Sequence, residues 1–109
     1  MIEERLFGLP ITAFEKIRGV FAQWSQIEKI ILYGSRAKGN FKNSSDLDLT
    51  MLGEGLDLNL LLNVVDQLDG LLLPWMIDLS ILDQIDNDSL REHIGRVGKV
   101  FYEKGSMAS

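Results

Sequence analysis

The sequence predicts a small α/β (α+β) domain in which helices cover one face of a mixed β-sheet of about four strands. At 109 residues the chain is large enough for one hydrophobic core and too small for two. Stretches with helical spacing of apolar residues alternate with short runs in which apolar and acidic residues alternate. This order is typical of a sheet with one face in a core and the other facing a site. We therefore expect one domain over residues 1–105.

Three segments are predicted to be longer helices. The first is Pro10–Trp24, because proline suits a first helical turn and apolar residues then recur every three or four positions. The second is Leu58–Leu68, with Asp57 as its N-cap. The third starts at Asn87 or Asp88 and runs to about Val97, and Gly98 is expected to end it. The last residues, 106–109, are small and polar, and we expect a tail that is either disordered or a remnant of cloning.

Four segments are predicted to be strands. Lys29–Tyr33 is a β-branched run that ends at a glycine, and Ser35–Lys38 is expected to form a short helix directly after it. In Asp46–Leu52 and Met76–Leu82 acidic or hydroxyl side chains alternate with apolar ones, so each strand should turn one face to the core. Lys99–Tyr102 completes the sheet.

Composition excludes several classes of protein. The net charge of −5 argues against binding long nucleic acids through many phosphate contacts. No cysteine is present, so disulfide frameworks and thiolate zinc sites are excluded. No apolar run is long enough to span a bilayer and the N-terminus does not resemble a signal peptide, so we expect a cytoplasmic protein.

Three carboxylates interrupt otherwise apolar strands: Asp46, Asp48 and Asp78. The first two are separated by one residue, so on an extended backbone both side chains leave the same face. Hard divalent cations such as Mg²⁺ prefer oxygen ligands, usually one or two carboxylates together with substrate phosphates. Two such ions can stabilise both the attacking and the leaving oxygen of an in-line displacement. A third carboxylate on a neighbouring strand could bind the ion nearest the attacking hydroxyl and accept its proton.

Gly34 and Ser35 are predicted to bind phosphate. Glycine lets the backbone approach a phosphate closely, and the serine hydroxyl and nearby N–H groups can bind its oxygens. Arg36 and Lys38 follow directly, and Lys42 is close, so a cationic spot suited to a small phosphate-bearing ligand surrounds this turn. The G-x-x-x-x-G spacing from Gly34 is also that of a P-loop, but the Lys-Ser/Thr pair that a P-loop needs is missing, and we reject that interpretation.

The motifs G-S-R-A-K-G, S-S-D-L-D-L and I-D-L-S together resemble the nucleotidyltransferase superfamily of the DNA polymerase β type. More narrowly, they resemble the minimal nucleotidyltransferase (MNT) family, whose MntA-like members are antitoxin partners of HEPN proteins. The resemblance covers nearly the whole chain and implies the polymerase β palm-like fold. It assigns Asp46, Asp48 and Asp78 to metal binding and catalysis, with two Mg²⁺ ions. It assigns the nucleotide to the following residues: Gly34, Ser35, Arg36, Lys38 and Ser45.

The resemblance implies transfer of a nucleotidyl group, AMP from ATP, to an acceptor hydroxyl. The family often has arginine where this chain has Lys38, so a bidentate phosphate contact would be lost there while the charge is kept. Because the chain leaves no room for an acceptor-binding domain, a separate helical HEPN protein is expected to be partner and acceptor. This chain would then be the antitoxin of a toxin–antitoxin module. No membrane and no extended nucleic acid is expected as a partner.

Other interpretations stay open at this point. The chain could be a catalytically silent MNT fold that neutralises or scaffolds its partner by contact. Modification of a small molecule such as an aminoglycoside would normally need a further domain or a cleft shared in a dimer. His93, the sole histidine, is interpreted as a surface or packing residue instead of a base. The leucine-rich span 56–73 is interpreted as mostly core, with a partner interface there as an alternative.

Overall fold

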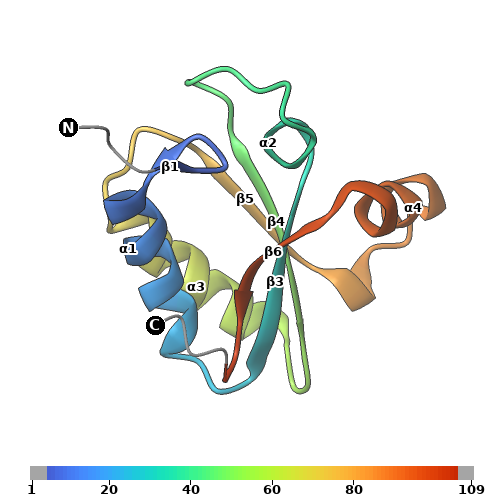
Figure 1. The fold of residues 1–109 in the computed structure, drawn as a ribbon. Coiled ribbons are helices and arrows are strands. Elements are labelled where there is room, and N and C mark those ends of the chain that lie inside the picture. Colours follow the sequence, from blue (N-terminus) through green and yellow to red (C-terminus); the bar gives the residue numbers. More distant parts are fainter. Residues whose placement is uncertain (1–4, 106–109) are drawn as a thin grey trace.

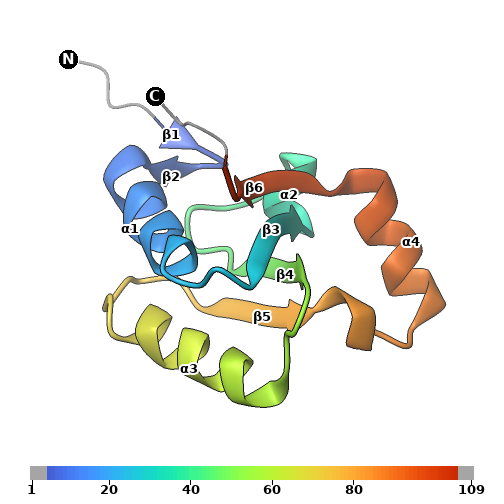
Figure 2. The ribbon, with the colours of Figure 1, turned by 90° about the horizontal axis from the view of Figure 1, so that it is seen from below.

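Two central antiparallel strands, β3 and β4, organise the structure. The computed structural model describes residues 5–105, and the predicted tail at 106–109 lies outside them. The sheet has the order β5-β4-β3-β6, in which only β4 and β5 are parallel, and Figure 2 shows the strands in this order. The predicted mixed sheet of about four strands is confirmed. The elements are β1 (Arg5–Leu6), β2 (Leu9–Pro10), α1 (Ile11–Ala22), β3 (Ile27–Tyr33), α2 (Ser35–Lys38), β4 (Leu47–Gly53), α3 (Leu58–Asp69), β5 (Ile77–Ile81), a 3-10 turn (Leu82–Gln84), α4 (Asp88–Val97) and β6 (Lys99–Glu103).

The hydrophobic core lies between the sheet and the pair α1 and α3, which cover one face in Figure 1. Alternate residues of the central strands point into it, and all of them are fully buried: Ile30, Leu32, Leu47, Leu49 and Met51. The buried side of α1 supplies Phe14, Ile17 and Phe21, and that of α3 supplies Leu60, Val64 and Leu68. The predicted apolar faces of both helices are therefore confirmed.

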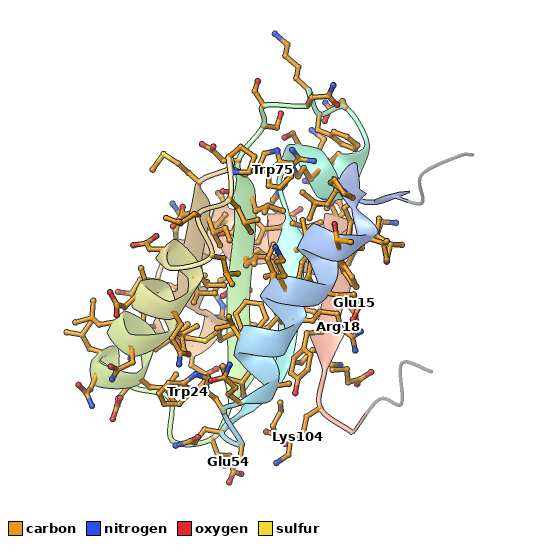
Figure 3. All side chains as sticks on the ribbon, turned by 90° about the vertical axis from the view of Figure 1, so that its left-hand side faces the viewer. Glu15, Arg18, Trp24, Glu54, Trp75 and Lys104 are labelled. Carbon is orange, nitrogen blue, oxygen red and sulfur yellow. The ribbon has the colours of Figure 1, made fainter. Side chains whose placement is uncertain are left out.

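The two tryptophans lie at opposite ends of this covered face, as Figure 3 shows. Trp24 lies beyond the end of α1 and donates its indole N–H to the Gln67 side chain of α3 at 2.8 Å. Trp75 lies near the end occupied by α2 and donates its indole N–H to the carbonyl of Asn43 at 2.8 Å. Each indole N–H thus finds the hydrogen-bond acceptor that a half-buried tryptophan usually has, and it connects two separate segments of the chain.

Helix α4 lies on the other side of the sheet, away from α1 and α3 (Figure 1). It begins at the N-cap Asn87, whose side chain accepts the N–H of Leu90 at 3.0 Å. Its buried residue is Ile94. A Cβ on Gly98 would come within 2.6 Å of Ile31 Cγ2, so the glycine at the helix end permits the close approach to β3. The sequence predicted this helix but did not predict its N-cap or which side of the sheet it covers.

The structure differs from the predicted elements mainly at their ends. Helix α1 begins after Pro10 and stops two residues before Trp24, and β3 begins two residues earlier than expected. The hairpin of β1 and β2 was not predicted, because strands of two residues show no periodicity. Its turn contains Phe7 and Gly8, both with positive φ. No helix within residues 5–105 is long and apolar enough to cross a membrane.

The N-cap of α3 gives a direct stability test. The side chain of Asp57 accepts the N–H of Leu60 at 2.8 Å, as predicted. We expect Asp57→Ala to lower the free energy of unfolding in urea by about 1 kcal/mol. Asp66→Ala, an exposed change within the same helix, should alter it by less than about 0.5 kcal/mol. Equal effects of the two substitutions would contradict the assigned cap.

Candidate functional site

The candidate site lies on the face of the sheet opposite the core, where acidic side chains of β4 and β5 meet. The parallel register pairs Asp48 with Asp78. On the other side of β4, Tyr33 of β3 pairs with Asp48. Paired residues of neighbouring strands present their side chains on the same face. Tyr33, Asp48 and Asp78 therefore form one row across the sheet.

The other two predicted carboxylates act electrostatically on Asp48. Asp48 is half-buried, and its pKa is raised by burial first, then by the negative charges of Asp78 and Asp46; His93 has the opposite, lowering effect. Asp46 lies just before β4 and is exposed, as is Asp78. The structure thus brings together the three aspartates that the sequence selected. What they bind stays a prediction.

Gly34 lies directly beside these carboxylates, at the end of β3. It has φ +76°, and a Cβ built at this position would collide with Oδ2 of Asp48. Any larger residue would therefore strain the backbone and displace the carboxylate. The Gly34 N–H donates to Nε2 of His93 at 3.3 Å. Ser35 follows as the first residue of α2 and is half-buried.

Arg36 is located differently from the expectation. It is only 2% exposed, and its guanidinium donates to the carbonyl groups of Ser45 (2.9 Å), Phe7 (2.8 Å) and Asn43 (3.1 Å). This fork of donors connects α2 to the N-terminal hairpin and to the loop before β4.

Two aromatic rings cover the same guanidinium. Its Cζ lies 5.0 Å from the ring centroid of Phe41 and 5.7 Å from that of Trp75. A side chain buried in this way and bound to three carbonyl groups is poorly placed to reach a phosphate. We therefore correct the interpretation of Arg36 as a phosphate ligand: its contacts are those of a residue that holds the turn in shape.

The remaining predicted nucleotide ligands lie around the same turn. Lys38 is exposed at the end of α2, and Lys42 is exposed in the loop that follows. The hydroxyl of Ser45 accepts the N–H of Lys42 at 2.8 Å, so it helps to close this loop. Phosphate binding by Lys38 and Ser45 stays a prediction.

A second pair of polar residues lies two positions further along β4 and β5 than the pair Asp48 and Asp78. Thr50 is fully buried, and Ser80, its partner in the register, donates to its hydroxyl at 3.0 Å. The pKa of Tyr33 is raised, mainly by burial and also by Asp48 and Asp78, against the lowering effect of a hydrogen bond with Ser80. These buried hydroxyl groups are therefore paired with one another, as buried polar groups in proteins usually are.

His93 was interpreted as a surface or packing residue, and the structure shows that it packs at the candidate site. It contacts Gly34 and faces Tyr33 with an edge-to-face ring geometry, 6.3 Å between centroids and 82° between planes. The contact with Gly34 was not predicted. The position of His93 depends on which side of the sheet α4 occupies. The spacing of residues in the sequence does not indicate which side α4 covers.

The side chains of the site match part of what Mg²⁺ requires of its ligands. Within residues 5–105 no group of three or more His, Cys, Asp or Glu side chains is arranged to hold a metal ion by itself. Mg²⁺, however, is commonly bound by one or two carboxylates, with substrate phosphates and water completing its shell. The adjacent carboxylates of Asp48 and Asp78 fit that requirement in chemistry, and their mutual repulsion would be relieved by a cation.

Surface depressions at the other end of the sheet are separate from this site. Two of them are lined in part by Glu28 and Lys104, and one also by Glu54. Figure 3 shows Glu54 and Lys104 at the end of the molecule far from α2. None of the candidate site residues contributes to their linings.

Comparisons with known proteins agree on one family. The family model of polymerase β nucleotidyltransferases ("Polymerase beta, Nucleotidyltransferase") matches residues 15–106. A search of curated protein sequences finds no match.

Solved structures share the fold at low sequence identity. A toxin–antitoxin structure with AMP-PNP has a TM-score of 0.68 and 22% identity, covering 84% of this chain and 74% of the other. A complex of tri-AMPylated Shewanella oneidensis HEPN toxin with MNT antitoxin has a TM-score of 0.64 and 20% identity, covering 85% and 71%. A proposed nucleotidyltransferase from Sulfolobus solfataricus has a TM-score of 0.55 and 13% identity, covering 97% and 96%. At these identities the likeness concerns the fold.

The raised pKa of Asp48 predicts a pH-dependent change in stability. A carboxyl group whose pKa is raised by folding destabilises the folded state when it is ionised. This destabilisation disappears when the pH falls below the ordinary aspartate pKa of 3.8, because the group is then protonated in the folded and in the unfolded chain. We expect Asp48→Asn to make the chain more stable at neutral pH in EDTA, measured by urea denaturation. The gain should shrink as the pH falls through the acidic range. A variant less stable than the wild type at neutral pH would contradict the repulsion described above.

The contacts of Arg36 predict a structural role that can be separated from phosphate binding. We expect Arg36→Met to lower the free energy of unfolding by roughly 2–4 kcal/mol, because it leaves several carbonyl groups without their donor. Lys38→Met, a change of similar shape at the exposed neighbouring position, should cost less than about 0.5 kcal/mol. Urea denaturation measures both. Unchanged stability of Arg36→Met together with weaker nucleotide binding would instead restore the role of phosphate ligand.

Proposed function

The chain belongs to the polymerase β family of nucleotidyltransferases, and from this premise we propose that it transfers AMP from ATP to a hydroxyl group of a HEPN-type partner protein. In this proposal it is the antitoxin of a toxin–antitoxin pair. The family match supports the type of reaction, since it spans residues 15–106 and therefore includes the whole candidate site.

Structures with the same fold support the choice of donor and acceptor. One is a toxin–antitoxin structure containing AMP-PNP, a non-hydrolysable relative of ATP. Another pairs an MNT antitoxin with a HEPN toxin that carries three AMP groups. A third neighbour is a toxin–antitoxin complex of MntA and HepT. ATP as donor and a HEPN protein as acceptor are the assignments that agree with these relatives.

The observation that carries the proposal is the pairing of Asp48 with Asp78 beside Gly34. Two carboxylates lie side by side across the parallel strands, and a third, Asp46, is close enough to raise the pKa of Asp48. A glycine backbone lies against Asp48, and a larger side chain would collide with it. This combination provides oxygen ligands for cations next to a backbone that a triphosphate can approach.

We assign the residues of the site as follows. Gly34 and Ser35 would bind the triphosphate through backbone N–H groups and the serine hydroxyl, with Lys38 adding positive charge. Asp46, Asp48 and Asp78 would hold two Mg²⁺ ions. Bound there, Mg²⁺ would neutralise phosphate charge and favour ionisation of the acceptor hydroxyl.

The proposed reaction is an in-line displacement at the α-phosphorus of ATP. The acceptor oxygen forms a bond to that phosphorus while the bond to the bridging oxygen of pyrophosphate breaks, and the leaving oxygen keeps the electron pair. The proton of the acceptor hydroxyl passes to a carboxylate, for which we propose Asp78. Like other phosphoryl transfers, the reaction depends mainly on positioning and on stabilising charge.

A transfer assay tests the proposal. Purified chain is mixed with its HEPN-type partner, Mg²⁺ and ATP labelled in the α-phosphate, and label on the partner is measured together with its mass. We expect the partner to gain mass in AMP units. Absence of label on the partner and on any other acceptor would contradict the enzymatic proposal.

Substitution of a carboxylate separates catalysis from binding by contact. We expect Asp46→Asn to slow transfer at least about 100-fold, because a charged group at the reacting centre is lost. The control Asp66→Asn makes the same chemical change on the exposed side of α3 and should leave the rate unchanged. If Asp46→Asn still neutralised the toxin fully in cells, the chain would be a catalytically silent binding module.

A further inference from the structure

His93 reaches the candidate site from a part of the chain that is distant in sequence. It lies on α4, while the turn that it contacts follows β3, 59 residues earlier. Its ring is half-buried and packs against the ring of Tyr33 at the end of β3. Neither the sequence motifs nor the proposed chemistry assigns it a role.

The hydrogen bond with Gly34 defines what this histidine can do. Its Nε2 accepts the Gly34 N–H at 3.3 Å, so the lone pair of this nitrogen is engaged with the backbone. A nitrogen already engaged with the backbone is poorly available as a general base for an acceptor hydroxyl. The contact instead restrains the orientation of the peptide group between Tyr33 and Gly34, at the start of the turn formed by Gly34 and Ser35 (the glycine-serine turn).

Helix α4 is fixed independently of this contact. Arg91 donates to the carbonyl of Leu82 at 2.7 Å, which ties the helix to the turn after β5. Ile94, one residue after His93, is buried, and Gly98 allows the helix end to touch Ile31 of β3. Since the helix is held at both ends, His93 is presented to Gly34 by a rigid support.

We propose that His93 is a positioning residue that holds Gly34 in the orientation needed for nucleotide binding. Gly34 touches Asp48 on one side and His93 on another, so both its neighbours restrict the turn. A turn that rotated away from His93 would shift the Ser35 N–H and hydroxyl relative to the carboxylates. The effect on catalysis rests on the proposed function, whereas the restraint on Gly34 does not.

Two substitutions separate the hydrogen bond from ring packing. His93→Phe keeps an aromatic ring against Tyr33 but has no acceptor for the Gly34 N–H. His93→Gln lacks the ring but offers a carbonyl oxygen as acceptor. Glu92→Gln is the matched control on α4, because Glu92 is exposed and engaged only in a surface ion pair with Arg96 at 3.7 Å among the contacts described.

The first measurement is hydrogen exchange of the Gly34 amide in the nitrogen-15-labelled chain, which needs no substrate. We expect His93→Phe to speed exchange about tenfold, the effect of losing one hydrogen bond of ordinary strength. His93→Gln should recover most of the protection, and Glu92→Gln should leave it unchanged. Circular dichroism of each variant verifies that the fold is retained.

The second measurement is AMP transfer to the partner. We expect His93→Phe to lower kcat/KM about tenfold, mainly through kcat, because the bound triphosphate would be misaligned. Unchanged exchange of Gly34 in His93→Phe would overturn the positioning role, as would failure of His93→Gln to recover either quantity. If the wild type transfers no AMP, the proposed function fails, and the exchange data still decide whether His93 restrains the turn.

Discussion

The parallel pairing of β4 with β5 places Asp48 beside Asp78, and two like charges on neighbouring strands repel each other. Burial of Asp48 strengthens the repulsion, because less water is present to screen it. The opposite face of the same strands must supply the compensating stability. There Leu47, Leu49 and Met51 are fully buried against α1 and α3 (Figure 1). The fold thus uses a well-packed apolar layer to hold an unfavourable acidic row in place.

The turn next to this row is restrained from several directions. Arg36 binds carbonyl groups of the N-terminal hairpin and of the loop before β4, and two aromatic rings cover it. Gly34 lies against Asp48, and His93 accepts its N–H from α4. Segments from both ends of the chain therefore converge on five consecutive residues, 34–38. Such support is what a site needs when its function depends on accurate placement of phosphates.

Much of the framework could be predicted because local chemistry determines it. The alternation in β4 and β5 predicted the shared face of Asp46, Asp48 and Asp78. The helix 35–38 and the cap Asp57 were found where predicted, and α4 starts at one of the two expected positions. These features depend on nearest neighbours and on periods of two or 3.6 residues.

What could not be predicted depends on long-range packing. Arg36 occurs in a basic, polar stretch that is typical of the surface, yet it is buried, and one of the rings that cover it, Trp75, comes from a distant part of the chain. The role of His93 follows from the side of the sheet that α4 covers, and neither composition nor spacing indicates that side. Family resemblance assigned Arg36 to the nucleotide, and His93 was interpreted as a surface or packing residue with no link to the glycine-serine turn. In both cases only the tertiary contacts distinguish binding from support.

We propose that Asp46, Asp48 and Asp78, together with the turn at Gly34 and Ser35, form a Mg²⁺–nucleotide site. Calorimetric titration of the chain with AMP-PNP, in Mg²⁺ or in EDTA, measures whether it does. We expect binding that requires Mg²⁺ and that is at least about tenfold weaker in Asp48→Asn, because a charged ligand is removed. Equal affinity in EDTA, or in the variant, would contradict it.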